Sequence, residues 1–271
     1  MRLRVKHETT YQYEVPIASA IQTLRLMPRS YDGLSVLNWQ VSSDARHELP
    51  SYIDGYGNIT HCHTVNHPHA HAAIFVEGEV ETTATHGVVR GAPEPLPPLF
   101  FLRRTALTTA DVAIEALARE AAKQGSILKQ LHALLNAVRD KVDYRLGTTD
   151  AATTAAEALA AGAGVCQDHA HIFIAAARVL GIPARYVGGY LWTGFDSREY
   201  QASHAWAEAF VHDLAWVGFD AANRVCPTEA YIRTSVGLDY WSSAPVRGVR
   251  RGVAAESLAV SVKVTQPGVE Q

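Results

Sequence analysis

Cysteine is scarce in this sequence, neither sign of charge dominates, and no long apolar run occurs. The three cysteines, Cys62, Cys166 and Cys226, are an odd number and lie far apart. They argue against the disulfide framework of small secreted domains, and we expect free thiols in a reducing cytoplasm. Lysine plus arginine number 24 against 27 for aspartate plus glutamate, so the net charge of −3 gives no reason to expect nucleic acid or an anionic membrane as a partner. No window is as long and apolar as a membrane span, and residues 1–6 alternate charged and apolar side chains, unlike a signal peptide.

The first third of the chain has the pattern of a β-domain. Short alternating runs of apolar and polar residues fill 1–88, separated by turn residues such as those at 54–58, and helical periodicity is absent. The segment 91–99 then contains four prolines, which make a stiff, extended connector. We therefore predict an N-terminal, sandwich-like β-domain over 1–88 and a proline-rich linker over 89–107.

Residues 108–271 show helices first and strands afterwards. A cap-like start at 108–111 and apolar residues at helical spacing over 127–142 predict two helices, and a capping box at 154–157 predicts a third. Three strands are expected later (184–191, 203–211 and 215–220). This order is typical of an α+β domain. The alternating segment 257–264 is predicted as a final strand, and its pattern leaves open which sheet receives it.

One cysteine stands where a helix is expected to begin. Gly162 and Gly164 give a flexible approach to Cys166, and apolar residues then recur at helical spacing until Gly181 and Pro183 end the helix. Unpaired backbone N–H groups and the positive end of the helix dipole would stabilise a thiolate at this position. Asp168 complements the same dipole, so we interpret it as a helix-start residue.

A histidine and a carboxylate follow at matching ends of a predicted hairpin. His204 opens the strand 203–211, Asp220 closes the strand 215–220, and residues 212–214 form the turn. Antiparallel pairing would bring these two side chains together at one end of the sheet. A cysteine, a histidine and a carboxylate in this order can act as nucleophile, base and orienting group.

Four motifs in this region resemble those of the transglutaminase-like superfamily of papain-type thiol enzymes. They are G-A-G-V-C-Q-D-H-A-H at 162–171, G-I-P-A-R-Y-V-G-G-Y-L at 181–191, S-H-A-W-A-E-A-F at 203–210 and A-W-V-G-F-D at 215–220. The front of the chain is similar to the β-domain of bacterial members, through H-E-T-T-Y-Q-Y at 7–13, L-R-L-M-P-R at 24–29 and Y-I-D-G-Y-G-N at 52–58. After Asp220 many relatives have Pro-Thr, whereas this chain has Ala-Ala-Asn at 221–223.

The resemblance implies a papain-like core over 108–271 in an α+β protein, with Cys166 as nucleophile, His204 as base and Asp220 as orienting acid. It implies a cysteine protease or amidase that hydrolyses a peptide or other amide through a thioester acyl-enzyme. An amine could instead capture the thioester, which would make the protein a transamidase. A thiol mechanism needs neither cofactor nor metal. Tyr144 and Gln167 both remain open as the second donor of the oxyanion hole.

Two other function classes compete with this interpretation. A peptide-binding module of the same fold without catalysis would usually lack one of the three residues, and all three are present. A metal site is suggested by the histidines of the segment 61–71. Strand alternation would place His61 and His63 on one face and Cys62 on the other, so the sequence predicts no metal ligands there.

Overall fold

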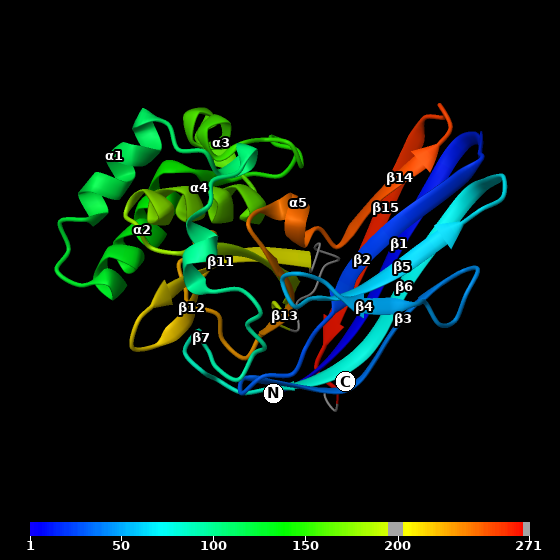
Figure 1. Ribbon diagram of the computed structural model, residues 1–271, viewed down its shortest axis with the longest axis horizontal. Helices are drawn as coiled ribbons and strands as arrows, with labels where there is room; N and C mark the ends of the chain where they lie inside the picture. The colour runs from blue at the N-terminus through cyan, green and yellow to red at the C-terminus, as the bar shows by residue number, and fades with distance from the viewer. Residues whose placement is uncertain (195–202, 268–271) are drawn as a thin grey trace.

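The computed structural model describes residues 1–194 and 203–267, and it consists of a helical half beside a half made of long strands (Figure 1). Two four-stranded sheets, in the orders β15-β1-β6-β3 and β14-β2-β5-β4, form the strand half. A five-stranded sheet, β13-β10-β11-β12-β7, lies in the other half with the helices. The protein is therefore α+β, with an N-terminal β-region followed by the expected core.

The strands have the following bounds. They are β1 (Arg2–Ile17), β2 (Ser19–Met27), β3 (Leu34–Ser43), β4 (Ser51–Ile53), β5 (Ile59–Val65), β6 (His69–Thr82), β7 (Val88–Val89), β8 (Asp143–Tyr144), β9 (Ala163–Gly164), β10 (Ala184–Leu191), β11 (Ser203–Val211), β12 (Ala215–Phe219), β13 (Tyr231–Gly237), β14 (Val246–Arg251) and β15 (Glu256–Thr265). The helices are α1 (Val112–Ala121), α2 (Ile127–Lys141), α3 (Ala155–Ala161), α4 (Cys166–Val179) and α5 (Tyr240–Ser243), with 3-10 turns at Pro98–Leu102 and Ala106–Thr108. Among the described residues, no helix is long and apolar enough to cross a membrane.

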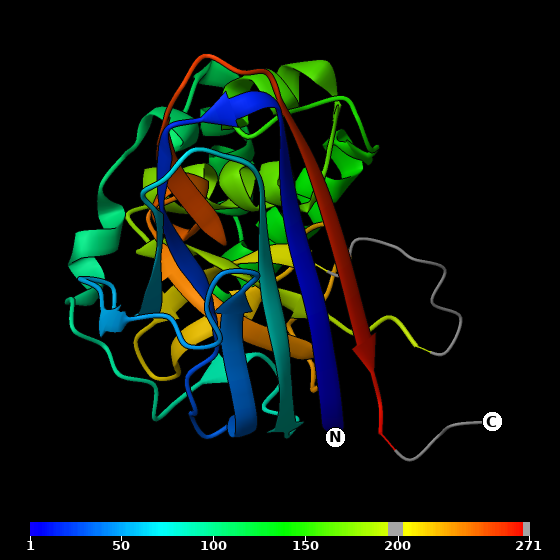
Figure 2. The same ribbon diagram turned by 90° about the vertical axis from the view of Figure 1, so that its right-hand side faces the viewer.

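The C-terminal strands return to the N-terminal sheets (Figure 2). Antiparallel pairing joins β14 to β2 and β15 to β1. The segment 257–264 is a strand as predicted, but it extends the β-region although it follows the core in sequence. Val262 and Val264 are buried in the cluster that also holds Leu3 and Val5 of β1. Apolar residues near the two ends of the chain, about 260 residues apart in sequence, therefore pack into one core.

Local signals position the helices where the sequence predicts them. Asp111 accepts a hydrogen bond from the Ile114 backbone N–H at 2.9 Å and so caps α1. Thr154 and Glu157 form the predicted capping box of α3, and Gly162 ends that helix with a left-handed φ of 63°. These caps satisfy backbone groups that a helix end leaves without partners.

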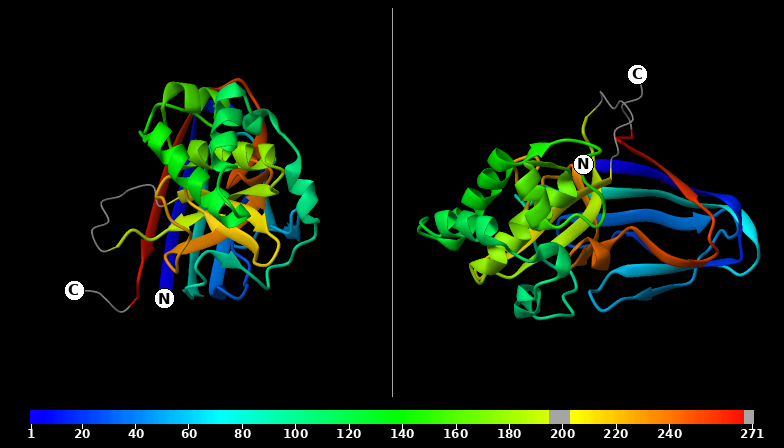
Figure 3. Two further views of the ribbon diagram at one scale, coloured as in Figure 1. Left: turned by 90° about the vertical axis from the view of Figure 1, so that its left-hand side faces the viewer. Right: turned by 90° about the horizontal axis from the view of Figure 1, so that it is seen from above.

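Helix α4 packs against the core sheet between the sheet and the other helices (Figure 3). The face of β11 toward this helix carries the small side chains Ala205, Ala207 and Ala209, which share one core with Phe173 and Ile174 of α4. Small residues on the strand let the helix approach closely. The first turn of α4 is thereby held over the end of β11 where His204 lies.

Candidate active site

The hairpin of β11 and β12 brings His204 and Asp220 together as predicted. Ala207 pairs with Phe219, and residues 212–214 form the connecting turn. His204 Nε2 lies 2.6 Å from Asp220 Oδ2, and both side chains are almost fully buried. A carboxylate only accepts hydrogen bonds, so Nε2 carries the proton and Nδ1 is left for another partner.

Two residues that the sequence interpretation missed hold Asp220 in place. The Tyr231 hydroxyl and the Asn223 side-chain amide each donate to Asp220 Oδ2 at 2.7 Å, and the Asn223 backbone N–H donates to Oδ1 at 3.2 Å. Asn223 belongs to the Ala-Ala-Asn stretch that departs from the usual motif, and Tyr231 lies on β13. The only sequence feature that pointed to either residue was the asparagine three positions after Asp220.

Cys166 is the first residue of α4, and Asp168 shapes the approach to it. Asp168 Oδ2 accepts from the Val165 backbone N–H at 2.7 Å and from the Thr149 hydroxyl at 2.6 Å. A side chain at Gly164 would bring its Cβ within 2.7 Å of Asp168, so this close approach requires glycine. Asp168 is therefore the helix-start residue that the sequence predicts, and it fixes the loop that delivers the thiol.

The charges of the site favour a protonated His204. Burial lowers the pKa of His204, but the negative sulfur of Cys166 and the hydrogen bond to Asp220 outweigh burial and raise this pKa to about 10. Burial raises the pKa of Asp220, but the hydrogen bond and charge of His204 outweigh burial, so the net direction is down. Cys166 and Asp220 therefore act in the same direction on His204 and favour its protonated form.

Tyr144 lies beside Cys166 because two short strands pair. Tyr144 of β8 pairs with Gly164 of β9 in a parallel register, just before the thiol. The ring of His169 lies beneath this contact, stacked on Tyr144 at 6.1 Å, with ring nitrogens 2.8 Å and 3.0 Å from the carbonyl oxygens of Val165 and Val142. Partial burial and the charge of Cys166 raise the pKa of Tyr144 to about 12, so its hydroxyl keeps its proton at neutral pH. Gln167 also lines the pocket, but its amide lies 3.5 Å from the Asp150 carbonyl.

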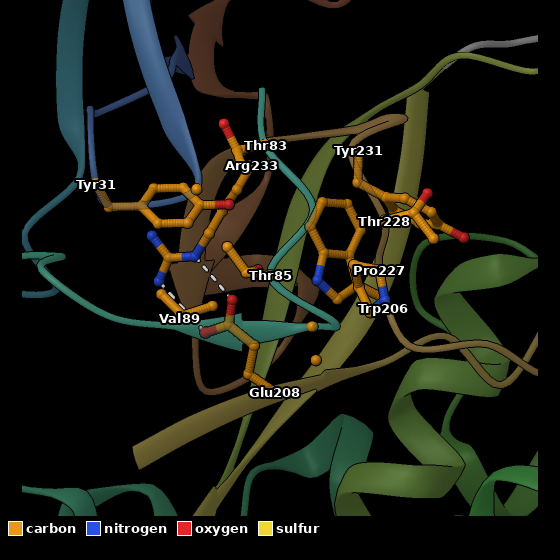
Figure 4. A pocket seen from close by; sticks show the side chains of 13 residues that line it. Tyr31, Thr83, Thr85, Val89, Trp206, Glu208, Pro227, Thr228, Tyr231 and Arg233 are labelled. Carbon is orange, nitrogen blue, oxygen red and sulfur yellow. Dashed lines mark hydrogen bonds and ion pairs between the residues drawn. The ribbon is translucent and has the colours of Figure 1, made fainter. Parts of the chain in front are cut away.

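Aromatic and charged side chains of β11 and β13 lie beside His204. Trp206 is buried and its ring stacks on the His204 ring at 6.2 Å. A cavity of about 20 Å³ adjoins this ring, and Trp206, Tyr231, Glu208 and Arg233 border it (Figure 4). Arg233 Nε donates to Glu208 Oε1 at 2.8 Å, as the dashed line in that view shows. His204 therefore lies against a buried layer of aromatic and charged side chains.

The histidines of 61–71 are spread over the β-region. His61 and His63 are buried while Cys62 between them is less so, in agreement with the predicted alternation. His63 pairs with Gln22 at 2.9 Å, and His71 pairs with Asp44 at 3.1 Å. Within residues 1–194 and 203–267, no three histidine, cysteine or acidic side chains are grouped as a metal site requires.

Comparisons with known proteins agree with this architecture. The family model of the transglutaminase-like superfamily matches residues 115–221, and that of the bacterial transglutaminase-like N-terminal region matches residues 3–81. An uncharacterized protein of Mycobacterium leprae is 32% identical, over 98% of this chain and 99% of its own length. The chain belongs to the transglutaminase-like superfamily. An uncharacterized protein of Mycobacterium tuberculosis is 29% identical, over 92% of this chain and 87% of its own length.

A solved structure shares the complete fold of this transglutaminase-like chain. It is that of a candidate cysteine protease from Cytophaga hutchinsonii, with a TM-score of 0.80 and 20% identity, covering 100% of this chain and 92% of the other. The likeness therefore includes the N-terminal sheets as well as the core. Cys166, His204 and Asp220 all lie within the matched superfamily segment, whereas Asn223 and Tyr231 lie beyond it.

Proposed function

We propose that this protein is a cysteine-dependent hydrolase of peptide or other amide bonds. The observation that carries the proposal is the hydrogen bond of 2.6 Å from His204 Nε2 to Asp220, which leaves Nδ1 for the thiol of Cys166 in the same pocket. Cys166 is also the largest of the causes that raise the pKa of His204, so the two side chains interact directly. The description of the Cytophaga hutchinsonii protein as a candidate cysteine protease is consistent with hydrolysis.

In the proposed reaction, the Cys166 thiolate attacks the amide carbonyl and forms a tetrahedral intermediate. His204 donates its Nδ1 proton to the leaving amine, and a thioester to Cys166 remains. His204 then takes a proton from water, whose oxygen attacks the thioester and releases the acid and the free thiol. Asp220 keeps the proton of the imidazole on Nε2 throughout. If an amine replaces water, the same site performs transamidation.

The oxyanion of the intermediate needs hydrogen-bond donors, and we assign this role to the Cys166 backbone N–H and the Tyr144 hydroxyl. Tyr144→Phe should lower kcat by about 10²- to 10³-fold because it removes one donor that acts mainly in the transition state. The phenylalanine ring can still stack on His169, so the melting temperature should be unchanged. Steady-state rates on an amide substrate measure the effect. Gln167→Ala is the matched control, and a larger loss in this variant would assign the role to Gln167.

The proposed nucleophile is tested by comparing the three thiols. Brief exposure to iodoacetamide near neutral pH, followed by mass spectrometry, should modify Cys166 first. Burial raises the pKa of the Cys226 thiol, which makes it less reactive. His204→Ala should slow the labelling of Cys166 in particular. Equal labelling of all three cysteines in the folded protein would contradict a special role for Cys166.

Turnover assays then separate the proposed activity from its alternatives. Release of an amine from a peptide or amide substrate indicates hydrolysis, while incorporation of an added primary amine indicates transamidation. Saturable peptide binding without either product would indicate a binding module.

A further inference from the structure

The pocket that contains Cys166 and His204 extends away from the core and reaches the β-region. It has a volume of about 320 Å³ and is half-enclosed. Tyr186 and Tyr240 line it from the core, and Tyr11, Leu258 and Val260 line it from β1 and β15. The two halves of the molecule therefore enclose a single space around the thiol.

The wall from the β-region is the end of a continuous apolar face. Residues 258, 260, 262 and 264 alternate onto one side of β15, opposite residues 11, 9, 7 and 5 of β1. Val262 and Val264 are buried against the core, but Leu258 and Val260 are 55% and 42% exposed, respectively. The exposed pair projects into the pocket, so the face continues beyond the point where the core covers it.

The pocket offers no charge to a ligand apart from its reacting pair. Among the lining residues that the structure describes, none is aspartate, glutamate, lysine or arginine. His7 also lines it, but both its ring nitrogens have partners, Tyr190 and Thr9, at 2.8 Å. Burial lowers the pKa of His7 to about 4, so this histidine is neutral at pH 7. A charged side chain would lose water here without gaining an ion pair.

We propose that this pocket binds an apolar side chain of the substrate, next to the carbonyl that Cys166 attacks, and that Tyr11, Leu258 and Val260 select it. The inference rests on the proposed function and adds a substrate class, amides with a bulky aliphatic or aromatic group at this position. It also assigns a role to the β-region. The C-terminal strand β15 returns to β1 and thereby completes a specificity wall for an active site carried by the core.

The test uses two alkylating probes that require only the Cys166 thiol. These are iodoacetamide and its N-phenylethyl derivative, and the quantity measured is the ratio of their labelling rates at Cys166. Leu258→Glu should lower the preference for the phenylethyl probe by about tenfold, since hydrophobic pockets of this kind discriminate by 10- to 200-fold. The matched control is Val249→Glu on β14, because Val249 is 72% exposed and lies outside this pocket. Its ratio should equal that of the wild type.

The possible outcomes separate an error in the pocket assignment from an error in the proposed function. If iodoacetamide fails to label Cys166 selectively in the wild type, the proposed function is wrong. If labelling is selective but Leu258→Glu and Val249→Glu give the same ratio, the pocket assignment is wrong. Leu258→Ala, which adds no charge, should lower the ratio less than Leu258→Glu. If the glutamate variant does not fold, the alanine variant tests the pocket assignment instead, and a ratio equal to that of the wild type would contradict it.

Discussion

Cys166→Ala is expected to abolish amide turnover, and His204→Ala to cost nearly as much, on the order of 10⁴- to 10⁶-fold in kcat. The nucleophile and its base act as a unit, so removing either one leaves the other without its function. Cys166 begins α4 without capping it, so Cys166→Ala should still fold, with a slightly lower melting temperature because Cys166 is the largest cause that raises the pKa of His204. Steady-state rates and thermal melts of both variants, measured with one substrate, check this result. A folded Cys166→Ala protein with normal turnover would exclude the thiol mechanism.

Asp220→Asn is expected to reduce turnover less and to change its pH dependence. Asp220 orients the imidazole, and an asparagine oxygen can still accept from His204 Nε2. Loss of the carboxylate charge should lower the pKa of His204 from about 10, because burial then opposes protonation with less compensation. The alkaline limb of the rate profile should therefore move to lower pH. The two limbs belong to the Cys166–His204 pair as a coupled unit.

The raised pKa of His204 also predicts how the stability of the fold depends on pH. The pKa of His204 is raised from 6.5 to about 10 on folding, so its contribution is fully present below pH 6.5 and is lost as the pH rises through about 10. Asp220→Asn should weaken this alkaline loss of stability. Melting curves between pH 6 and pH 11 would show it, and an identical alkaline loss in wild type and variant would argue against the Asp220–His204 interaction.

Glu208→Gln is expected to destabilise the fold by about 3–5 kcal/mol, because it leaves two arginines buried without a full counter-charge. Glu208 is fully buried, and its two oxygens accept from Arg185 Nε at 2.7 Å and from Arg233 Nε at 2.8 Å. Arg185 also lies over the Trp216 ring at 3.8 Å and pairs with Glu94 of the linker. One carboxylate thus joins β10, β11 and β13. Arg233 and Arg185 lower the pKa of Glu208 despite its burial, so its stabilising charge is present at neutral pH and is lost only in acid.

Thermal denaturation at pH 7 measures this effect. A loss of 3–5 kcal/mol corresponds to a fall in melting temperature of roughly 6–20 °C for a chain of this size. The matched control is Glu115→Gln on α1, whose side chain is half exposed and lies 3.8 Å from Arg119. Exposed pairs of this kind contribute at most about 1 kcal/mol. Equal melting temperatures for the two variants would contradict a structural role for the buried network.

Local signals in the sequence were enough to predict the elements that carry the site. The turn at 212–214, the capping box at 154–157 and the glycines before Cys166 each act within a few residues, and the structure has each of them where the sequence predicts it. The same signals place Cys166 at a helix start and His204 beside Asp220. Hairpin register and helix caps depend on neighbours in sequence, so they can be derived without the rest of the fold.

Contacts between distant segments were decided only by the tertiary structure. A strand with period-two alternation specifies which face is buried but not which strand it pairs with, so the sequence alone could not show that β15 joins β1. For the same reason it could not show that Tyr231 of β13 donates to Asp220, or that the Tyr144 hydroxyl interacts with Cys166. The apolar pocket also arises from two halves that meet in space. The sequence thus indicated the proposed reacting groups, and long-range packing determined which side chains contact them and line the pocket around them.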